Sequence, residues 1–148
     1  MPEMRTEVEV EAAPERVWDV VADPRNLPHW DRHIVAVRGV PPGGLEVGTN
    51  YTTDVRFMGV TAHVHATVLD LQPDRSSRIR LSGLLDGVVD TTIEPIDGDR
   101  TRLIQCIDYR FKGGPLGVFA AGAVRNLGAT SILRRGVMAQ KEQAEHGG

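Results

Sequence analysis

Two histidines one residue apart, His63 and His65, fall on the same face of a predicted strand, and this spacing is one that zinc sites use. Three further residues could add ligands: Asp54 on the neighbouring strand, and His29 or His33. The same face also carries Thr61 and Thr67, as the solvated side of a sheet does. We therefore expect no metal site.

Acid–base chemistry requires a titratable group held inside a cavity. The candidates on predicted strands are Asp90, Glu94, Asp108 and Arg110, and by alternation all four lie opposite the apolar faces. A one-residue slip of register would bring them inside. Cys106 shares the face of Asp108 and has no histidine near it in sequence, so we do not expect a nucleophile there. The sequence assigns no catalytic residue.

Composition narrows the class of protein. The 148 residues are 41% hydrophobic, which suffices for the core of a single domain over 1–148. A net charge of −3 argues against nucleic acid as a partner, and one cysteine excludes a disulfide framework. The chain shows neither a membrane-spanning run nor a secretory signal, so we expect a cytoplasmic protein without stable membrane insertion. No dinucleotide, Walker or hydrolase motif occurs, and we expect no cofactor.

The elements that would position these residues follow from periodicity. Alternation predicts a strand over 6–10, and Pro14 and Asp23-Pro24 then open two short helices, the second ending near Trp30. Period-two patterns predict six more strands, at 33–40, 48–58, 60–71, 78–85, 88–96 and 101–112. The turns between them are short and contain Gly, Pro or Asp, which favours an antiparallel meander. Asp86-Gly87 is predicted to be a two-residue hairpin turn. A long helix follows from about Leu116 to Glu145.

This order resembles that of the helix-grip superfamily, which includes START domains, Bet v 1-type proteins and bacterial polyketide cyclase/dehydratase-like proteins. Three segments are similar to the family in residue pattern as well: 13–24 (APERVWDVVADP), 26–30 (NLPHW) and 98–117, from Gly98-Asp99-Arg100 to Gly113-Gly114-Pro115-Leu116-Gly117. The resemblance implies an α+β fold in which a curved seven-stranded antiparallel sheet wraps around the long C-terminal helix. It also implies a cavity between sheet and helix that holds an apolar or amphipathic small molecule.

The inward faces contain small residues, Ala62, Ala66 and Gly83, with Ala120 and Ala123 on the facing helix, and the chain has only seven aromatic residues. Either the helix lies very close to the sheet or a void remains. Apolar stripes also form ordinary packed cores, but with the resemblance we favour a void. The predicted ligand-binding residues are Trp30, Tyr51, Thr53, Phe57, Val64, Leu81, Gln105, Tyr109, Phe119, Ala123 and Leu127. Their few polar groups would orient the ligand.

Three functions fit such a cavity. The first is binding of a hydrophobic small molecule, such as a polyketide, a quinone or a lipid. The second is a polyketide aromatase/cyclase or dehydratase, in which Tyr51 and Tyr109 would polarise carbonyls and enclosure would favour ring closure. The third is a resistance protein that sequesters a toxic natural product, so that the setting would be antibiotic biosynthesis or resistance. The expected partner is a hydrophobic small molecule, and a homodimer stays open.

Overall fold

The computed structural model describes residues 3–57, 59–111 and 129–146. Its elements follow one another as predicted: one strand, short helices, six strands and a C-terminal helix. The strands are β1 (Glu3–Val10), β2 (Ile34–Arg38), β3 (Asn50–Phe57), β4 (Val60–Gln72), β5 (Ser76–Gly83), β6 (Leu85–Asp97) and β7 (Arg100–Phe111). The described helices are α1 (Pro14–Val21), the 3-10 turn η1 (Pro24–Asn26), α2 (Leu27–Trp30) and α4 (Ala129–His146).

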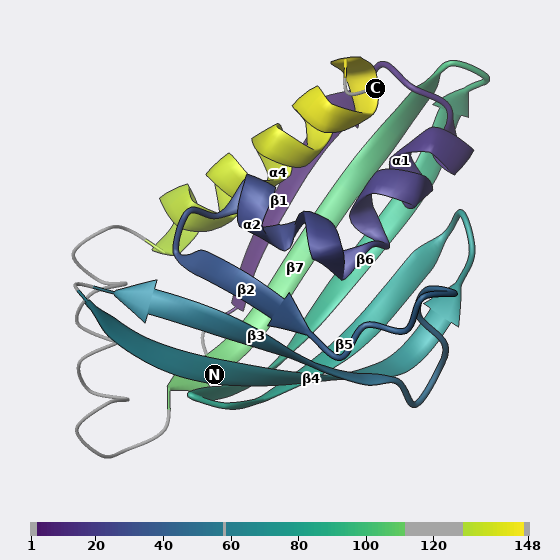
Figure 1. Ribbon diagram of the computed structural model, residues 1–148. Coiled ribbons are helices and arrows are strands. Elements are labelled where there is room, and N and C mark those ends of the chain that lie inside the picture. The colour runs from purple at the N-terminus through teal and green to yellow at the C-terminus, as the bar shows by residue number, and fades with distance from the viewer. Residues whose placement is uncertain (1–2, 58, 112–128, 147–148) are drawn as a thin grey trace.

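The seven strands form one antiparallel sheet in the order β1-β7-β6-β5-β4-β3-β2. Strands β2 to β7 are a meander, and β1 returns to pair with β7, so the two strands nearest the N-terminus are the two edges. Figure 1 shows the curved sheet with α1, α2 and α4 on the same side of it. The predicted α+β helix-grip architecture is confirmed over the described residues.

Local chemistry explains how the two short helices begin. Pro14 stands at the first position of α1, where its missing N–H costs no helix hydrogen bond. Asp23 caps η1, because its Oδ1 accepts from the backbone N–H of Arg25 at 3.0 Å. The Arg25 side chain also bonds this carboxylate and lowers the pKa of Asp23, although partial burial opposes the shift. The sequence prediction of both starts is confirmed.

The prediction of a hairpin turn at Asp86-Gly87 is wrong. The chain reverses at Gly83, which has a φ of 101°, and Leu84, whereas Asp86 and Gly87 belong to β6 and pair with Arg110 and Tyr109. Gly87 is required for a different reason, since a Cβ there would collide with the carbonyl oxygen of Asp108 on β7. A glycine needed for close strand approach had the sequence signature of a turn.

The C-terminal helix is fastened to the two N-terminal helices. The Arg16 guanidinium on α1 donates to the backbone carbonyls of Gln143 and Ala144, two of the last acceptors of α4. Trp30 of α2 donates its indole N–H to Oε1 of Gln143 at 2.9 Å, and Gln143 donates in turn to Asn26. Of the helix predicted over 116–145, the part from residue 129 onward is helical, as predicted. The part before residue 129 lies outside the described residues.

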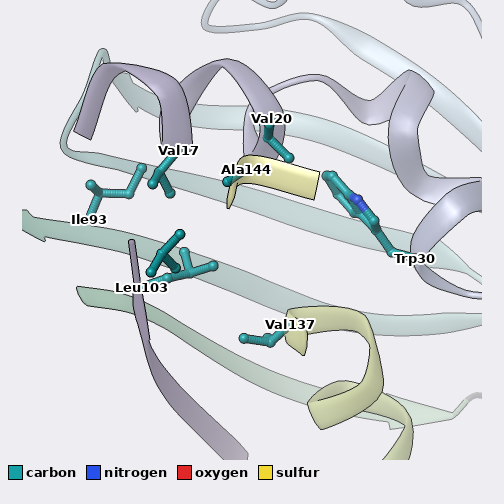
Figure 2. Packing of buried hydrophobic residues seen from close by; sticks show 8 residues of the cluster. Val17, Val20, Trp30, Ile93, Leu103, Val137 and Ala144 are labelled. Atoms are coloured by element: carbon teal, nitrogen blue, oxygen red, sulfur yellow. The ribbon is translucent and has the colours of Figure 1, made fainter. Parts of the chain in front are cut away.

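A cluster of buried apolar side chains lies at one end of the grip, and Figure 2 shows its packing. There α1 packs against β6 and β7, and α4 packs against β1 and α1. The cluster consists of Val10, Val17, Val20, Trp30, Ile93, Leu103, Val137 and Ala144. Val10, Val17, Leu103 and Val137 are wholly inaccessible to solvent. This end of the molecule is a packed core.

The inward faces predicted from alternation are largely correct. Tyr51, Thr53 and Val55 on β3 are buried, as are Ala62 to Val68 at alternate positions on β4. Val60, which the pattern also placed inside, is 41% exposed at the start of β4. It lies directly after the turn at Gly59.

Candidate ligand-binding cavity

Beyond the packed core, the described residues line a cavity of about 340 Å³ between the concave face of the sheet and the helices. Most of its wall is aliphatic and comes from β3 to β7. The helices α1, α2 and α4, the edge strands β1 and β2 and the loop residue Leu45 contribute further lining residues. Trp30 belongs both to the core cluster and to this wall. A volume in this range matches small-molecule sites rather than packing defects.

The hollow follows from the alternation of large and small residues across the sheet. The register places five inward residues side by side: Tyr51, Ala66, Leu81, Gly87 and Tyr109. We call this the tyrosine row. Both tyrosines of the chain stand in it, and Ala66 and Gly87 between them leave space that no side chain of the row fills.

Two hydroxyl groups on β3 face this space. Tyr51 and Thr53 are each 7% exposed and line the cavity. Neither side chain has a hydrogen-bond partner among the described residues. Burial raises the pKa of Tyr51 to about 12, so the phenol stays protonated at neutral pH and can donate a hydrogen bond. Such buried hydroxyls are costly unless something pairs with them.

A second polar group lies further along the strands. Gln105 donates from Nε2 to Oγ1 of Thr91 at 3.3 Å, and Gln140 of α4 donates to Oε1 of Gln105 at 3.5 Å. All three side chains are buried and line the cavity. Within the described parts of the chain, Oε1 of Gln140 has no partner.

An acid–base pair also lines the cavity. Oδ1 of Asp31 lies 2.9 Å from Nδ1 of His33 and 2.9 Å from its backbone N, and the side chains are 28% and 15% exposed. In the tautomer that donates Nδ1–H to the carboxylate, the ring's remaining lone pair is on Nε2. The His33 carbonyl accepts from the backbone N–H of Arg56, three residues beyond Thr53 on β3.

Sequence reasoning missed this pair. It searched the strands for acids and bases, whereas Asp31 and His33 follow α2, and His33 was weighed only as a metal ligand. The one available signal was Asp-x-His directly after a helix end, where an aspartate accepts from the N–H two residues on. Leu45, Ser77, Thr91 and Gln140 were missed as well, and all line the cavity.

Seven of the eleven predicted residues lie together around the cavity: Trp30, Tyr51, Thr53, Val64, Leu81, Gln105 and Tyr109. The other four are the side chain of Phe57 and the residues Phe119, Ala123 and Leu127, which lie outside the described residues. The two small inward residues of β4 differ in their surroundings. Ala66 lines the cavity, whereas Ala62 is packed against Val55, Val64 and Leu84.

The outer face of the sheet holds the other chemical candidates. His63 and His65 are exposed there, His63 paired with Asp54 at 2.7 Å and His65 with Thr52 at 3.1 Å. The pKa of Asp54 is lowered, chiefly by Arg38 and then by His63. None of the strand-borne residues Asp90, Glu94, Asp108 and Arg110 is among the described lining residues of the cavity.

Potential metal ligands come together at one other place. In the described ranges, the one group of ligand atoms close enough to share an ion is Glu142, Glu145 and His146, at the end of α4. It lies apart from the described wall of the cavity. Over the same ranges, no helix is long and apolar enough to cross a membrane.

A curved antiparallel sheet, gripped by a C-terminal helix around a largely apolar cavity, defines a helix-grip protein of the START/Bet v 1-like class. Residues 1–145 match the family described as "Polyketide cyclase / dehydrase and lipid transport", and the chain belongs to this family. The match spans nearly the whole chain, so the family assignment covers both the sheet and the C-terminal helix.

Solved structures share the fold. A protein of Thermus thermophilus superposes with a TM-score of 0.75 at 18% identity, over 97% of each chain. The Zhui aromatase/cyclase from a Streptomyces species gives 0.70 at 15% identity, over 99% of this chain and 98% of that one. A START superfamily protein from Mycobacterium smegmatis gives 0.70 at 18%, over 95% and 97%. At these identities the likeness is one of fold alone. A comparison with curated proteins gave no match.

Proposed function

We propose that this protein binds a hydrophobic small molecule of the polyketide, quinone or lipid-like type in the cavity between the sheet and the C-terminal helix. The observation that carries the proposal is the cavity itself, about 340 Å³ of space with a mainly aliphatic wall and a few buried polar groups. Burial of apolar ligand surface at about 25 cal/mol per Å² would supply most of the affinity. Membership of the cyclase and lipid-transport family supports the same proposal.

A thermal-shift screen of the purified chain with polyketides, quinones and lipids tests it. A ligand present at one hundred times its Kd adds about 2.7 kcal/mol to the stability of the folded state. In a domain of this size that raises Tm by about 5–10 °C. Tyr109→Phe keeps the ring and removes a hydroxyl from the cavity wall, so it should raise the Kd of the best compound. If no compound of the three classes shifts Tm, the proposal fails.

The Asp31–His33 pair favours a second candidate function, a polyketide cyclase or dehydratase. Nε2 of His33 would take a proton from a carbon between two carbonyls, and the electron pair would move onto a carbonyl oxygen. Tyr51 would hold that oxygen by a hydrogen bond. The carbanion equivalent then attacks a second carbonyl carbon of the same molecule, and the resulting alkoxide takes the proton back from His33.

Mass spectrometry of the bound compound separates the two candidates. Ring closure alone keeps the mass, changes the retention time and removes a carbonyl signal, whereas subsequent dehydration lowers the mass by one water. His33→Gln should abolish turnover and leave the Kd nearly unchanged, and Asp31→Asn should slow turnover, because Asp31 orients the imidazole. Unchanged compound after incubation with wild-type protein would leave binding as the function.

A further inference from the structure

The cavity has two polar ends, and the register of the sheet shows how they are separated. Next to the tyrosine row lies an aliphatic row of Val68, Ile79, Val89, Ile107 and Met4. Beyond it lies an amide row of Leu71, Ser77, Thr91, Gln105 and Thr6. Members of all three rows line the cavity. Polar groups therefore stand on both sides of an apolar band.

The separation of the two polar ends follows from strand geometry. Gln105 and Tyr109 are four residues apart on β7, and at 3.3–3.4 Å per residue their rows are about 13 Å apart. This spacing exceeds the reach of one small polar group. A ligand that satisfied both ends would have to be elongated along the strands.

Each end offers hydroxyls that the described protein does not pair. At the first end these are Tyr51 in the tyrosine row and Thr53 two residues further along β3, both more than nine-tenths buried. At the amide row Ser77 has no described side-chain partner, and Thr91, which accepts from Gln105, still has its own hydroxyl proton to donate. Both ends thus present donors to oxygen atoms of a ligand.

The charged residues that line the cavity indicate which net charge of ligand it can bind. Apart from tyrosines, the titratable residues among its described members are Asp31 and His33, which pair with each other. No arginine or lysine is found among these described members to neutralise a buried carboxylate. An unpaired buried carboxylate carries a large desolvation cost.

We propose, resting on the proposed binding function, that the cavity selects a neutral, elongated ligand that carries an oxygen at each end and an apolar body between. One oxygen accepts from Tyr51 in the tyrosine row and from Thr53 beside that row, and the other meets Ser77 and Thr91 at the amide row. The aliphatic row contacts the body of the molecule.

Fluorescence titration with four rigid probes tests this: anthracene, 2-hydroxyanthracene, 2,6-dihydroxyanthracene and anthracene-2-carboxylate. The dihydroxy probe, with oxygens at opposite ends, should bind about three- to tenfold more tightly than the monohydroxy probe. Tyr51→Phe should weaken the dihydroxy probe by a similar factor and leave anthracene unchanged. Ser77→Ala should do the same from the other end, and the two losses should multiply in the double variant.

Ser82→Ala is the matched control, because Ser82 pairs with His65 on the outer face of the sheet and should change no Kd. Three results would overturn the inference while leaving the binding function intact. They are a carboxylate probe that binds most tightly, equal Kd values for the two hydroxylated probes, and a Tyr51→Phe effect that is equal for all probes. If none of the four probes binds while a compound of the thermal-shift screen does, the inference fails and the binding function stands.

Discussion

The substitution Ala66→Ile tests whether the space beside β4 is an unfilled cavity. Ala66 is 2% exposed and stands in the tyrosine row between Tyr51 and Leu81, on the cavity wall. Isoleucine adds three carbon atoms, and at about 0.8 kcal/mol for each buried methylene the transfer gain is about 2.4 kcal/mol. Fixing the larger side chain costs about 0.5–1 kcal/mol. We expect a net stabilisation of about 1.5 kcal/mol, with loss of ligand binding.

The control for this substitution lies on the same face of the same strand. Ala62 is 4% exposed and is not itself a described lining residue of the cavity, although the three side chains it packs against, Val55, Val64 and Leu84, do line it. Ala62→Ile therefore overfills a packed region and should destabilise by about 1–3 kcal/mol. Urea unfolding followed by circular dichroism measures both changes as shifts of the midpoint at constant m-value.

The two variants should move in opposite directions, and Ala66→Ile should raise Tm by about 3–6 °C. Equal destabilisation by both would mean that the sheet is packed at Ala66 as it is at Ala62. The cavity, and with it the proposed function, would then be refuted without reference to any ligand.

Three further predictions concern what holds the grip together. Trp30→Phe should lower the free energy of unfolding by about 2 kcal/mol in urea, because it removes the indole hydrogen bond to α4; no change would mean that this bond adds nothing. Gly87→Ala should lower the free energy of unfolding by more than about 2 kcal/mol, because the added carbon clashes with β7. Gly43→Ala, where nothing lies within 4 Å of the added carbon, should change it by no more than about 0.5 kcal/mol. Asp23→Asn keeps the cap but removes the charge beside Arg25. Because the pKa of Asp23 is lowered in the folded state, the free energy of unfolding of wild type should exceed that of this variant by up to about 1 kcal/mol above pH 4. The difference should disappear as the pH falls through the folded pKa, and a difference that does not depend on pH would contradict this.

The fold could be predicted from sequence because its determinants are local. Period-two alternation gave the inward faces of β3 and β4, and Pro14 and Asp23 marked the helix starts. The hairpin at Asp86-Gly87 was wrong because a glycine in a tight turn and a glycine pressed against a neighbouring strand have the same local sequence. Only the pairing of β6 with β7 distinguishes the two cases.

The candidate site was predicted less completely, since it depends on which residues meet across strands. Tyr51 and Tyr109 were chosen separately, and the register then placed them in one row. The Asp31–His33 pair lay outside the search because its residues are in a connection after α2, where no periodic pattern assigns a side chain to a face. Alternation along a strand says which side a residue takes, but not which partners it finds there.

Because the packed core and the cavity are lined by largely different residues, substitutions can accumulate around the cavity without disturbing the core. The cluster around Val17, Leu103 and Val137 is closed at one end of the molecule, and Trp30 is the member that it shares with the cavity wall. Substitutions at the tyrosine, aliphatic and amide rows can therefore alter the shape and polarity of the cavity while that cluster stays intact. A lineage with this scaffold could acquire a new ligand by a few changes on β3 to β7, with selection for folding acting mainly on the other end.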